Sequence, residues 1–408
     1  MPNFRSISRL SILLAVVAAS PAFAAPKPGD ARPAGAGFIA ERGGLPNTFR
    51  RLLAGEKTVV AFLGGSITHG SGASVPENCY REKFTRYLKE QFPKADVTGV
   101  HAAVGGTGSW LGAFRLKDDA LDKGADLVLV EFAVNDGDDA EPRVLASMEG
   151  IVRQVRAARP EAEVLFVYTL AAQHLDAYRA NRLPERVQWH EKVAAAYNIP
   201  SVNMAQYAAA QIIAGKLTLE QFTPDGAHPT DRGYALYEEA LEQFMAKGRA
   251  AAEKKPAAKA ATYRLPKPMT PCPLERGLLV PVDRAKADAN WKAGAPSACW
   301  KFGTVLASDV PGATVTLTFK GDCAGIYQDL GPDTGDFDVS VDGKPWAPVK
   351  NFDDFAKTMY RIHGRTLAEG LDPKRPHEVK LRVAAATPSG SKGRMIRFGW
   401  FLVDGEKP

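Results

Sequence analysis

A serine, a histidine and an aspartate stand in contexts that could support nucleophilic catalysis. Ser66 follows a pair of glycines, which let another molecule approach the backbone closely. Asp225 and His228 are three residues apart in the segment DGAHP. A carboxylate at that offset can bind one imidazole nitrogen and leave the other free to act as a base. Taken singly, each segment also fits a structural role, Ser66 as a helix N-cap and the second segment as a surface turn.

Two further segments carry groups able to donate hydrogen bonds. Gly106 lies in GGTGS, a loop that could present backbone N–H groups, and Asn135 lies in FAVND with its amide side chain. Each of these segments, and Ser66 too, comes directly after a run of apolar and β-branched residues. These three positions are therefore expected at the ends of strands.

The region that contains these segments alternates between short apolar runs and helical patterns. The runs are continuous rather than alternating, which is typical of strands buried on both faces. Pro142 and Pro160 bracket one helical pattern. This order predicts an α/β fold with a parallel sheet between helices, and ligands in such sheets bind beyond the carboxyl ends of the strands. The predicted strands are residues 58–65, 97–104, 126–135, 163–171 and 199–204.

The C-terminal part of the chain has a different pattern. Its β-prone runs are separated by Gly, Asp and Pro, which favours an all-β sandwich that resembles a jelly roll. The predicted strands there are residues 314–319, 337–341, 378–383 and 397–403.

Ser66 after Gly-Gly, Gly106, Asn135 and the Asp225/His228 pair occur in this order, and together they resemble the SGNH (GDSL-like) hydrolase superfamily. The resemblance implies a flavodoxin-like three-layer fold and a serine esterase. Ser66 would be the nucleophile, His228 the general base and then acid, and Asp225 the group that orients His228. The N–H groups of Ser66 and Gly106, with the Asn135 amide, would form the oxyanion hole.

The resemblance covers residues 57–245 and has two departures from the usual motifs. Ala133 stands where the family usually has Gly, and His101 stands where Asn is common. Neither position carries one of the implied catalytic side chains. A dinucleotide-binding enzyme is the rival interpretation, since glycines 106, 108 and 112 follow a strand, but it leaves Ser66 and the Asp225/His228 pair without a role. No HExxH or similar spacing is present, so we expect neither a metal nor a cofactor.

The N-terminus has the features of an export signal. Arg5 and Arg9 precede a short apolar run over residues 10–19, and the small-x-small motif AFA ends at Ala24. The run is too short to span a bilayer. We therefore expect cleavage after Ala24, a periplasmic or secreted protein, and no stable membrane insertion.

The net charge of +6 is concentrated in one segment. Residues 247–267 alone carry an excess of six positive charges within an Ala/Lys/Pro-rich run that is typical of a linker. A nucleic-acid partner is not expected, because its basic patch would have to lie on a folded surface. The four cysteines allow several pairings. The predicted divisions are a signal peptide 1–24, a lead segment 25–56, the hydrolase domain 57–247, a linker 248–268 and a β-sandwich domain 269–408.

The expected substrate is an acylated, chiefly acetylated, carbohydrate. Residues 324–344 resemble the jelly-roll portion of two-domain carbohydrate esterases. A lipase or arylesterase, a sugar O-acetyltransferase and a non-catalytic glycan-binding protein are the alternatives. The aromatic, charged segment 351–365 is predicted to be a loop that closes one side of the Ser66 cleft. Exposed aromatic side chains of the β domain could contact sugar faces, the candidates being Trp300, Tyr327, Trp346 and Tyr360.

Overall fold

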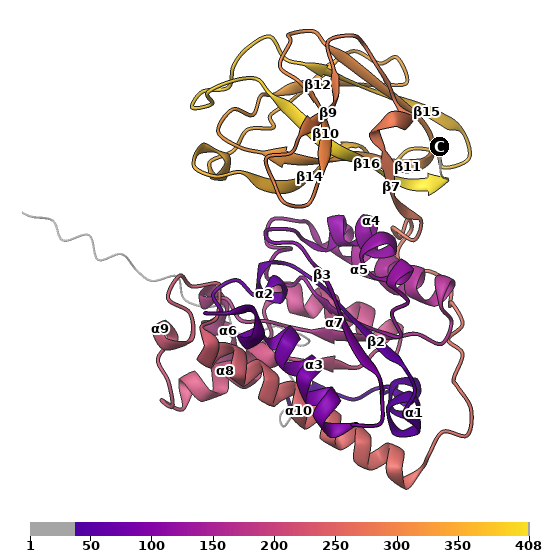
Figure 1. The fold of residues 1–408 in the computed structure, drawn as a ribbon, viewed down its shortest axis with the longest axis vertical. Helices are drawn as coiled ribbons and strands as arrows, with labels where there is room; N and C mark the ends of the chain where they lie inside the picture. Colours follow the sequence, from indigo (N-terminus) through magenta and orange to yellow (C-terminus); the bar gives the residue numbers. More distant parts are fainter. Residues whose placement is uncertain (1–36, 407–408) are drawn as a thin grey trace, which may run out of the picture.

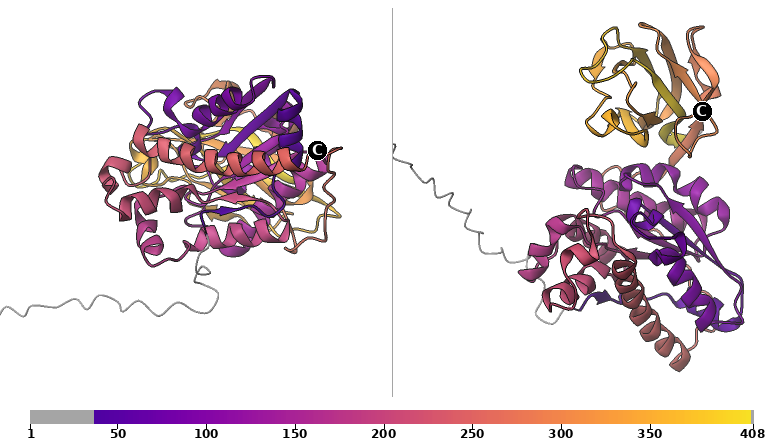
Figure 2. Two further views of the ribbon diagram at one scale, coloured as in Figure 1. Left: turned by 90° about the horizontal axis from the view of Figure 1, so that it is seen from below. Right: turned by 60° about the vertical axis from the view of Figure 1, so that its left-hand side comes forward.

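The computed structural model describes residues 37–406. The predicted signal peptide 1–24 and its cleavage site lie outside these residues. Figure 1 shows an α/β domain and a β domain stacked along the longest axis, and the right-hand view of Figure 2 shows the same arrangement from another side. Within residues 37–406 no helix has the length and apolar character that crossing a bilayer requires.

The α/β domain is built on a six-stranded sheet with the order β1-β6-β5-β4-β2-β3. Its strands are parallel except β1, which pairs antiparallel with β6 at one edge, so the sheet is mixed rather than wholly parallel. Strand β2 lies between β3 and β4, the position at which the chain order reverses and ligands usually bind. The strands are β1 Ile39–Ala40, β2 Thr58–Gly64, β3 Val97–Ala103, β4 Leu127–Glu131, β5 Glu163–Val167 and β6 Ser201–Val202.

Helices cover both faces of this sheet, as the continuous apolar runs predict. Ala61 and Leu63 of β2 belong to a core shared with α4, α5 and α7, whereas Val60 and Phe62 face a core shared with α1, α3, α8 and α10. Strand β3 differs, because as an edge strand it is partly exposed. The helices are α1 Pro46–Ala54, α2 Ser66–His69, α3 Tyr80–Gln91, α4 Ser109–Asp119, α5 Glu141–Ala158, α6 Leu175–Arg179, α7 Glu185–Ala196, α8 Met204–Ile213, α9 Leu219–Phe222 and α10 Asp231–Lys254.

Two predicted divisions of the chain need correction. Part of the lead segment 25–56 belongs to the α/β domain, since β1 and α1 pack within it. The linker predicted at 248–268 begins too early, because α10 continues to Lys254. The residues after α10 return along the α/β domain to reach β7 (Figure 1), and Tyr263 fixes them there by donating from its N–H to Pro160 O (2.8 Å) and from its hydroxyl to Glu163 (2.6 Å).

The β domain is antiparallel throughout its ten described strands. The long strand β11 pairs with β8 and β15 in its first half and with β14 and β16 in its second half, so it joins the two parts of the domain. The predicted fold class, an α/β domain followed by an all-β domain, is confirmed. The strands are β7 Gly277–Pro281, β8 Lys286–Ala287, β9 Lys292–Pro296, β10 Thr304–Ser308, β11 Thr314–Leu330, β12 Phe337–Val341, β13 Ala347–Val349, β14 Arg361–Ala368, β15 Pro376–Val383 and β16 Ile396–Glu406.

The two domains share part of one hydrophobic core. Trp110 and Phe114 of α4 belong to the same buried cluster as Phe302, Tyr327 and Leu402 of the β domain. Helices α4 and α5 form the side of the α/β domain that faces the β domain (Figure 1). The β domain is therefore packed against the α/β domain and is not merely tethered to it.

Candidate active site

Ser66 is the first residue of α2, directly after the switch-point strand β2. The chain turns from strand to helix at Gly65, the N-cap residue. A Cβ at Gly65 would lie 2.0 Å from Asn135 Oδ1, so only glycine allows these two segments to meet. The turn leaves the Ser66 side chain partly exposed at the carboxyl edge of the sheet.

His228 and Asp225 reach Ser66 from the turn that precedes α10. His228 Nε2 lies 2.9 Å from Ser66 Oγ, and His228 Nδ1 lies 2.7 Å from Asp225 Oδ2. A carboxylate accepts hydrogen bonds, so the proton of the neutral ring is placed on Nδ1 and Nε2 is left to accept from the Ser66 hydroxyl. The three side chains therefore form a continuous chain of hydrogen bonds.

The backbone of the same turn holds the Asp225 carboxylate in place. Its Oδ1 accepts from the N–H groups of Ala227 (2.9 Å) and His228 (2.8 Å). Burial raises the pKa of Asp225, but these N–H groups and the His228 ring outweigh it, and the pKa of Asp225 lies well below its usual value. The carboxylate is therefore ionised at any pH at which the protein is expected to work.

Gly106 and Asn135 lie beside Ser66. Both line the same cavity, and the position of Asn135 against Gly65 brings its amide close to the start of α2. Among residues 37–406, the N–H groups of Ser66 and Gly106 and the Asn135 amide nitrogen donate to no other protein group. These three donors are thus available to an oxygen atom bound next to Ser66.

A buried pair fixes the two loops that carry these donors. Asp136 Oδ1 accepts from the N–H of Ser109 (2.7 Å), and Asp136 Oδ2 lies 2.8 Å from His190 Nε2. The side chains of Asp136 and His190 are completely buried. Asp136 therefore ties the loop of Gly106 to the segment that carries Asn135. The sequence pattern placed Asp136 beside Asn135 but gave no sign of this role.

A second buried carboxylate lies beneath α2. Glu131 Oε2 accepts from the Thr68 hydroxyl (3.0 Å) and Glu131 Oε1 from the Thr169 hydroxyl (2.7 Å). Burial raises the pKa of Glu131 although both hydroxyls donate to it. Glu131 thus connects the ends of β4 and β5 to the short helix that begins with Ser66.

The donors around Ser66 open into a cavity of about 860 Å³ between the two domains. Gly106, Trp110 and Asn135 line it from the α/β domain, and Phe355 and Arg365 line it from the β domain. A volume of this size is ordinary for a small-molecule site. Both domains therefore contribute walls to the space next to Ser66.

Several nitrogen atoms in this cavity have no partner among the described residues. They include Nε of Arg361 and of Arg365 and Nδ1 of His363, all buried. Burial, with the nearby Arg365 and Arg361 cations, lowers the pKa of His363 to about 3, so its ring is neutral. Arg361 pairs with Asp353, and Arg143 pairs with Asp139 (3.3 Å). The wall thus offers polar groups to a ligand without a large excess of charge.

The segment 351–365 was predicted to be a loop at the cleft, and its structure differs from that prediction. It does reach the cavity, but Arg361 begins strand β14, which pairs with β11. Of the aromatic candidates, Tyr327 is wholly buried and packs on Phe302. Trp346 lies against Arg382 and Tyr360 against Arg397 within the β domain, and neither lines the cavity.

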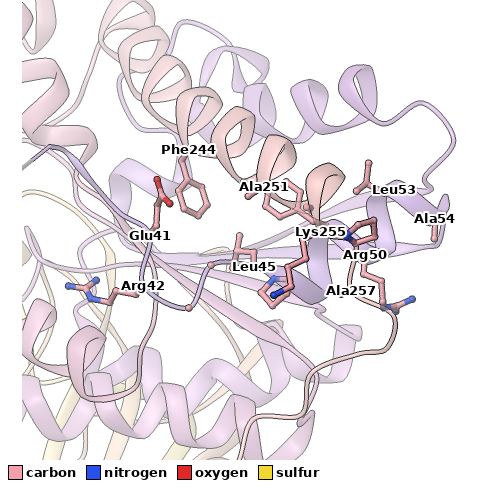
Figure 3. Close-up of a pocket in the computed structure, with 17 residues that line it drawn as sticks. Glu41, Arg42, Leu45, Arg50, Leu53, Ala54, Phe244, Ala251, Lys255 and Ala257 are labelled. Carbon is pink, nitrogen blue, oxygen red and sulfur yellow. The ribbon is translucent and has the colours of Figure 1, made fainter.

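A second hollow, of about 580 Å³, lies between α1 and the end of α10 (Figure 3). Helix α1 leads into β2, whereas Ser66 follows β2, and the seven residues of that strand separate the two by roughly 20 Å. The lining is largely apolar, with Leu53 and Phe244 among its side chains. This hollow is therefore separate from the candidate active site.

The chain resembles known proteins in sequence and in fold. Residues 62–236 match the sequence model of the GDSL-like Lipase/Acylhydrolase family. The crystal structure of a two-domain esterase (CEX) active on acetylated mannans is 27% identical, with a TM-score of 0.76, and the match covers 91% of this chain and 98% of that one. The structure of such an esterase co-crystallized with mannopentaose is 26% identical, with a TM-score of 0.73, and the match covers 88% and 93%. No curated protein sequence matches the chain.

The two esterase structures match nearly the whole chain, so the likeness includes the β domain and its place after the α/β domain. The family match spans the segments that carry Ser66, Gly106, Asn135 and Asp225/His228. Residues 62–236 thus form a domain of the GDSL-like lipase/acylhydrolase type, and a second, all-β domain follows it as in the two matched esterases.

Proposed function

We propose that this esterase removes acyl groups, chiefly acetyl groups, from the hydroxyls of a carbohydrate by a Ser-His-Asp mechanism. The observation that carries the proposal is the chain of hydrogen bonds from Ser66 through His228 to Asp225. Gly106 and Asn135, which lie beside Ser66, line the cavity between the domains. The two matched esterases are described as active on acetylated mannans, and one is co-crystallized with mannopentaose. These descriptions support a carbohydrate as the substrate.

In the first half of the proposed reaction, Ser66 Oγ attacks the ester carbonyl while His228 Nε2 takes the hydroxyl proton. The carbonyl oxygen becomes an oxyanion, which the N–H groups of Ser66 and Gly106 and the Asn135 amide stabilise. One such donor lowers the barrier by about 3–4 kcal/mol. The bond to the sugar oxygen then breaks, and His228 returns the proton to that oxygen, so the sugar leaves as an alcohol and the acyl group stays on Ser66.

In the second half, water replaces the sugar. His228 takes a proton from the water as its oxygen attacks the acyl carbon, and the same donors stabilise the second oxyanion. The bond to Ser66 breaks, the proton returns to Ser66 Oγ, and the carboxylic acid is released. Asp225 keeps the ring oriented and stabilises the imidazolium in both halves.

The cavity supports a polar substrate better than a long acyl chain. Its unpartnered nitrogen atoms on Arg361, His363 and Arg365 suit the oxygen atoms of a sugar, which supply many hydrogen-bond acceptors. A lipase would be expected to offer an apolar channel instead. The group that faces Ser66 is accordingly proposed to be small and the rest of the ligand polar.

The test is a comparison of wild type with Ser66→Ala on 4-nitrophenyl esters of rising chain length and on acetylated mannan and acetylated xylan. We expect acetate release from a polysaccharide, a preference for the acetyl ester, and loss of turnover in Ser66→Ala with the melting temperature unchanged. Ser71→Ala is the matched control, because the Ser71 hydroxyl makes no hydrogen bond to another described side chain and should leave turnover intact.

A serine-directed phosphonate provides the second measurement, since it should label Ser66 in the wild type. Labelling at another serine would overturn the assignment of the nucleophile. Preference for long-chain esters with no acetate released from polysaccharides would favour a lipase or arylesterase instead.

A further inference from the structure

Trp300 is an exposed tryptophan that projects from the β domain toward the α/β domain. It lies in the connection 297–303 between β9 and β10, and 64% of its surface is exposed. Its ring stacks on the ring of His69, with centroids 5.8 Å apart and planes 29° apart. A side chain of this size normally buries most of its surface, so a tryptophan fixed on one side and open to solvent offers a surface for a ligand.

The position of this ring is close to the nucleophile. His69 is the last residue of α2, whose first residue is Ser66, and residues three apart on a helix are neighbours. His69 Nδ1 also lies 3.1 Å from His101 Nε2 on β3. Strands β3 and β4 lie on opposite sides of β2 in the sheet. His101 on β3 and Asn135 after β4 therefore flank the end of β2, which Ser66 follows.

Ionic contacts between the domains hold this connection in place. Lys301 Nζ lies 2.7 Å from Asp119, and both side chains are largely buried. Asp119 in turn pairs with the buried Arg115 (3.0 Å). On the other side, the N–H of Ala298 donates to the Asp329 carboxylate (2.9 Å). The ring of Trp300 is thus positioned before any ligand binds, which reduces the entropy cost of binding.

The rings behind Trp300 are uncharged at neutral pH. Burial lowers the pKa of His69, and the nearby Arg81 cation lowers it further. The same two effects, together with His69 itself, lower the pKa of His101 to about 4. The two histidine rings behind Trp300 are therefore neutral. Lys301 Nζ lies 5.9 Å from the centroid of the Trp300 ring, but it is paired with Asp119. The aromatic ring thus suits the C–H face of an uncharged sugar ring.

We propose that Trp300, supported by His69, binds a sugar ring of the substrate chain next to the ring that carries the ester. This inference rests on the proposed function and extends it, because it makes the substrate an oligomer or polymer rather than a single acylated sugar. The acylated ring would occupy the space at Ser66, and the chain would continue across Trp300. Recognition would then depend on both domains.

The experiment uses the full-length chain with Trp300→Ala. We expect the ratio of kcat/KM on an acetylated oligosaccharide to kcat/KM on 4-nitrophenyl acetate to fall about tenfold, with the loss in KM rather than in kcat. Trp300→Phe keeps an aromatic face and should recover most of the ratio. The oligosaccharides are prepared from whichever of acetylated mannan and acetylated xylan the wild-type enzyme deacetylates.

Trp346→Ala is the matched control, since Trp346 is another tryptophan of the β domain but its ring lies over Arg382, 4.4 Å from the guanidinium. Its ratio should equal that of the wild type. Binding is measured separately by calorimetry with the deacetylated oligosaccharide and the Ser66→Ala enzyme. Adding Trp300→Ala should weaken this binding about tenfold, and melting temperatures report whether each variant is folded.

Each outcome has one meaning. A folded Trp300→Ala enzyme with a wild-type ratio and wild-type binding overturns the role of Trp300 while leaving the esterase proposal intact. A wild-type enzyme that cleaves 4-nitrophenyl acetate but neither polysaccharide overturns the proposed function, and this inference with it. An equal loss in Trp300→Ala and Trp346→Ala would indicate a general effect on the β domain and would also overturn the specific role of Trp300.

Discussion

Asp225 is held as an anion by its own turn rather than by a distant cation. Its Oδ1 accepts two backbone N–H groups, so Oδ2 is left to bind the His228 ring. This division of labour explains why an aspartate three residues before a histidine can serve on a surface turn, where more than half of the Asp225 side chain is exposed. The backbone N–H groups of the turn therefore keep the carboxylate ionised without a cation beside it.

The pH dependence of the rate should therefore reflect a single proton. The pKa of Asp225 is lowered, so its carboxylate stays ionised above that low pKa. The negative charge is lost only when the pH falls through the lowered pKa. Because Asp225 takes up no proton in the working range, we expect the acidic limb of a plot of log kcat/KM on 4-nitrophenyl acetate against pH to have a slope no greater than one. Asp225→Asn should reduce kcat by about 10³–10⁴-fold. A slope of two in the wild type would contradict this account.

At the level of elements, the short helix α2 depends on groups beneath and beside it. Glu131 binds Thr68 from below. Arg115 of α4 is completely buried and donates from Nη2 to Gly64 O (2.9 Å) and from Nη1 to Ala102 O, so it links the ends of β2 and β3. The same Arg115 pairs with Asp119, which reaches Lys301 of the β domain. Arg115 and Asp119 thus link the strand end before Ser66 to the β9–β10 segment that carries Trp300.

Arg115→Met tests this connection. Removing Arg115 breaks a buried ion pair and takes one donor from each of Asp119, Gly64 O and Ala102 O, although Lys301 and Val104 N–H still donate to Asp119 and Gly64 O. We expect a loss of about 3–5 kcal/mol in the free energy of unfolding. Activity on 4-nitrophenyl acetate should fall as well, because the Ser66 turn loses its support. Denaturant unfolding measures the first effect. Arg86→Met is the control, since Arg86 is about half exposed and should cost far less; equal losses in both variants would refute the role of Arg115.

The sequence predicted the α/β elements well because their signals are local. Continuous apolar runs gave β2, β4 and β5, and the strand ends placed Ser66 and Asn135 at one edge of the sheet. The β domain was harder. Strand β14 begins with RIHGR, whose charges and glycine resemble a loop, and it becomes a strand through pairing with the distant β11. No local pattern reports such a pairing.

In the candidate site, too, some residues were predictable from the sequence and others were not. The order of the motifs predicted the hydrogen-bonded set of Ser66, His228 and Asp225, whose catalytic roles stay predictions. The segment 351–365 was predicted to close one side of the cleft, but the roles of Arg361, His363 and Arg365 in its wall were not predicted, because that wall forms only where β14 meets α4 across the domain boundary. Residues that act from a second domain carry no spacing signature relative to the first.

At the scale of the whole molecule, the β domain contributes both to the wall of the candidate active-site cavity and to the hydrophobic core. Trp110 of α4 lines the cavity and also belongs to the cluster that contains Phe302 and Tyr327. The same contacts that join the domains thus shape the space next to Ser66. Arg143 adds a polar link by donating to the Thr366 hydroxyl (2.7 Å). A change at this boundary should affect stability and substrate binding together.

Gly364→Val provides this test. A Cβ at Gly364 would lie 2.9 Å from the Trp110 ring and 3.2 Å from Leu111, so valine should push the domains apart at a cost of about 1–3 kcal/mol. We expect two unfolding transitions in place of one, and a loss of acetate release from polysaccharide. Gly303→Val is the matched control, because nothing lies within 4 Å of a Cβ there. A single wild-type transition and full polysaccharide activity in Gly364→Val would show that the cleft does not depend on this boundary.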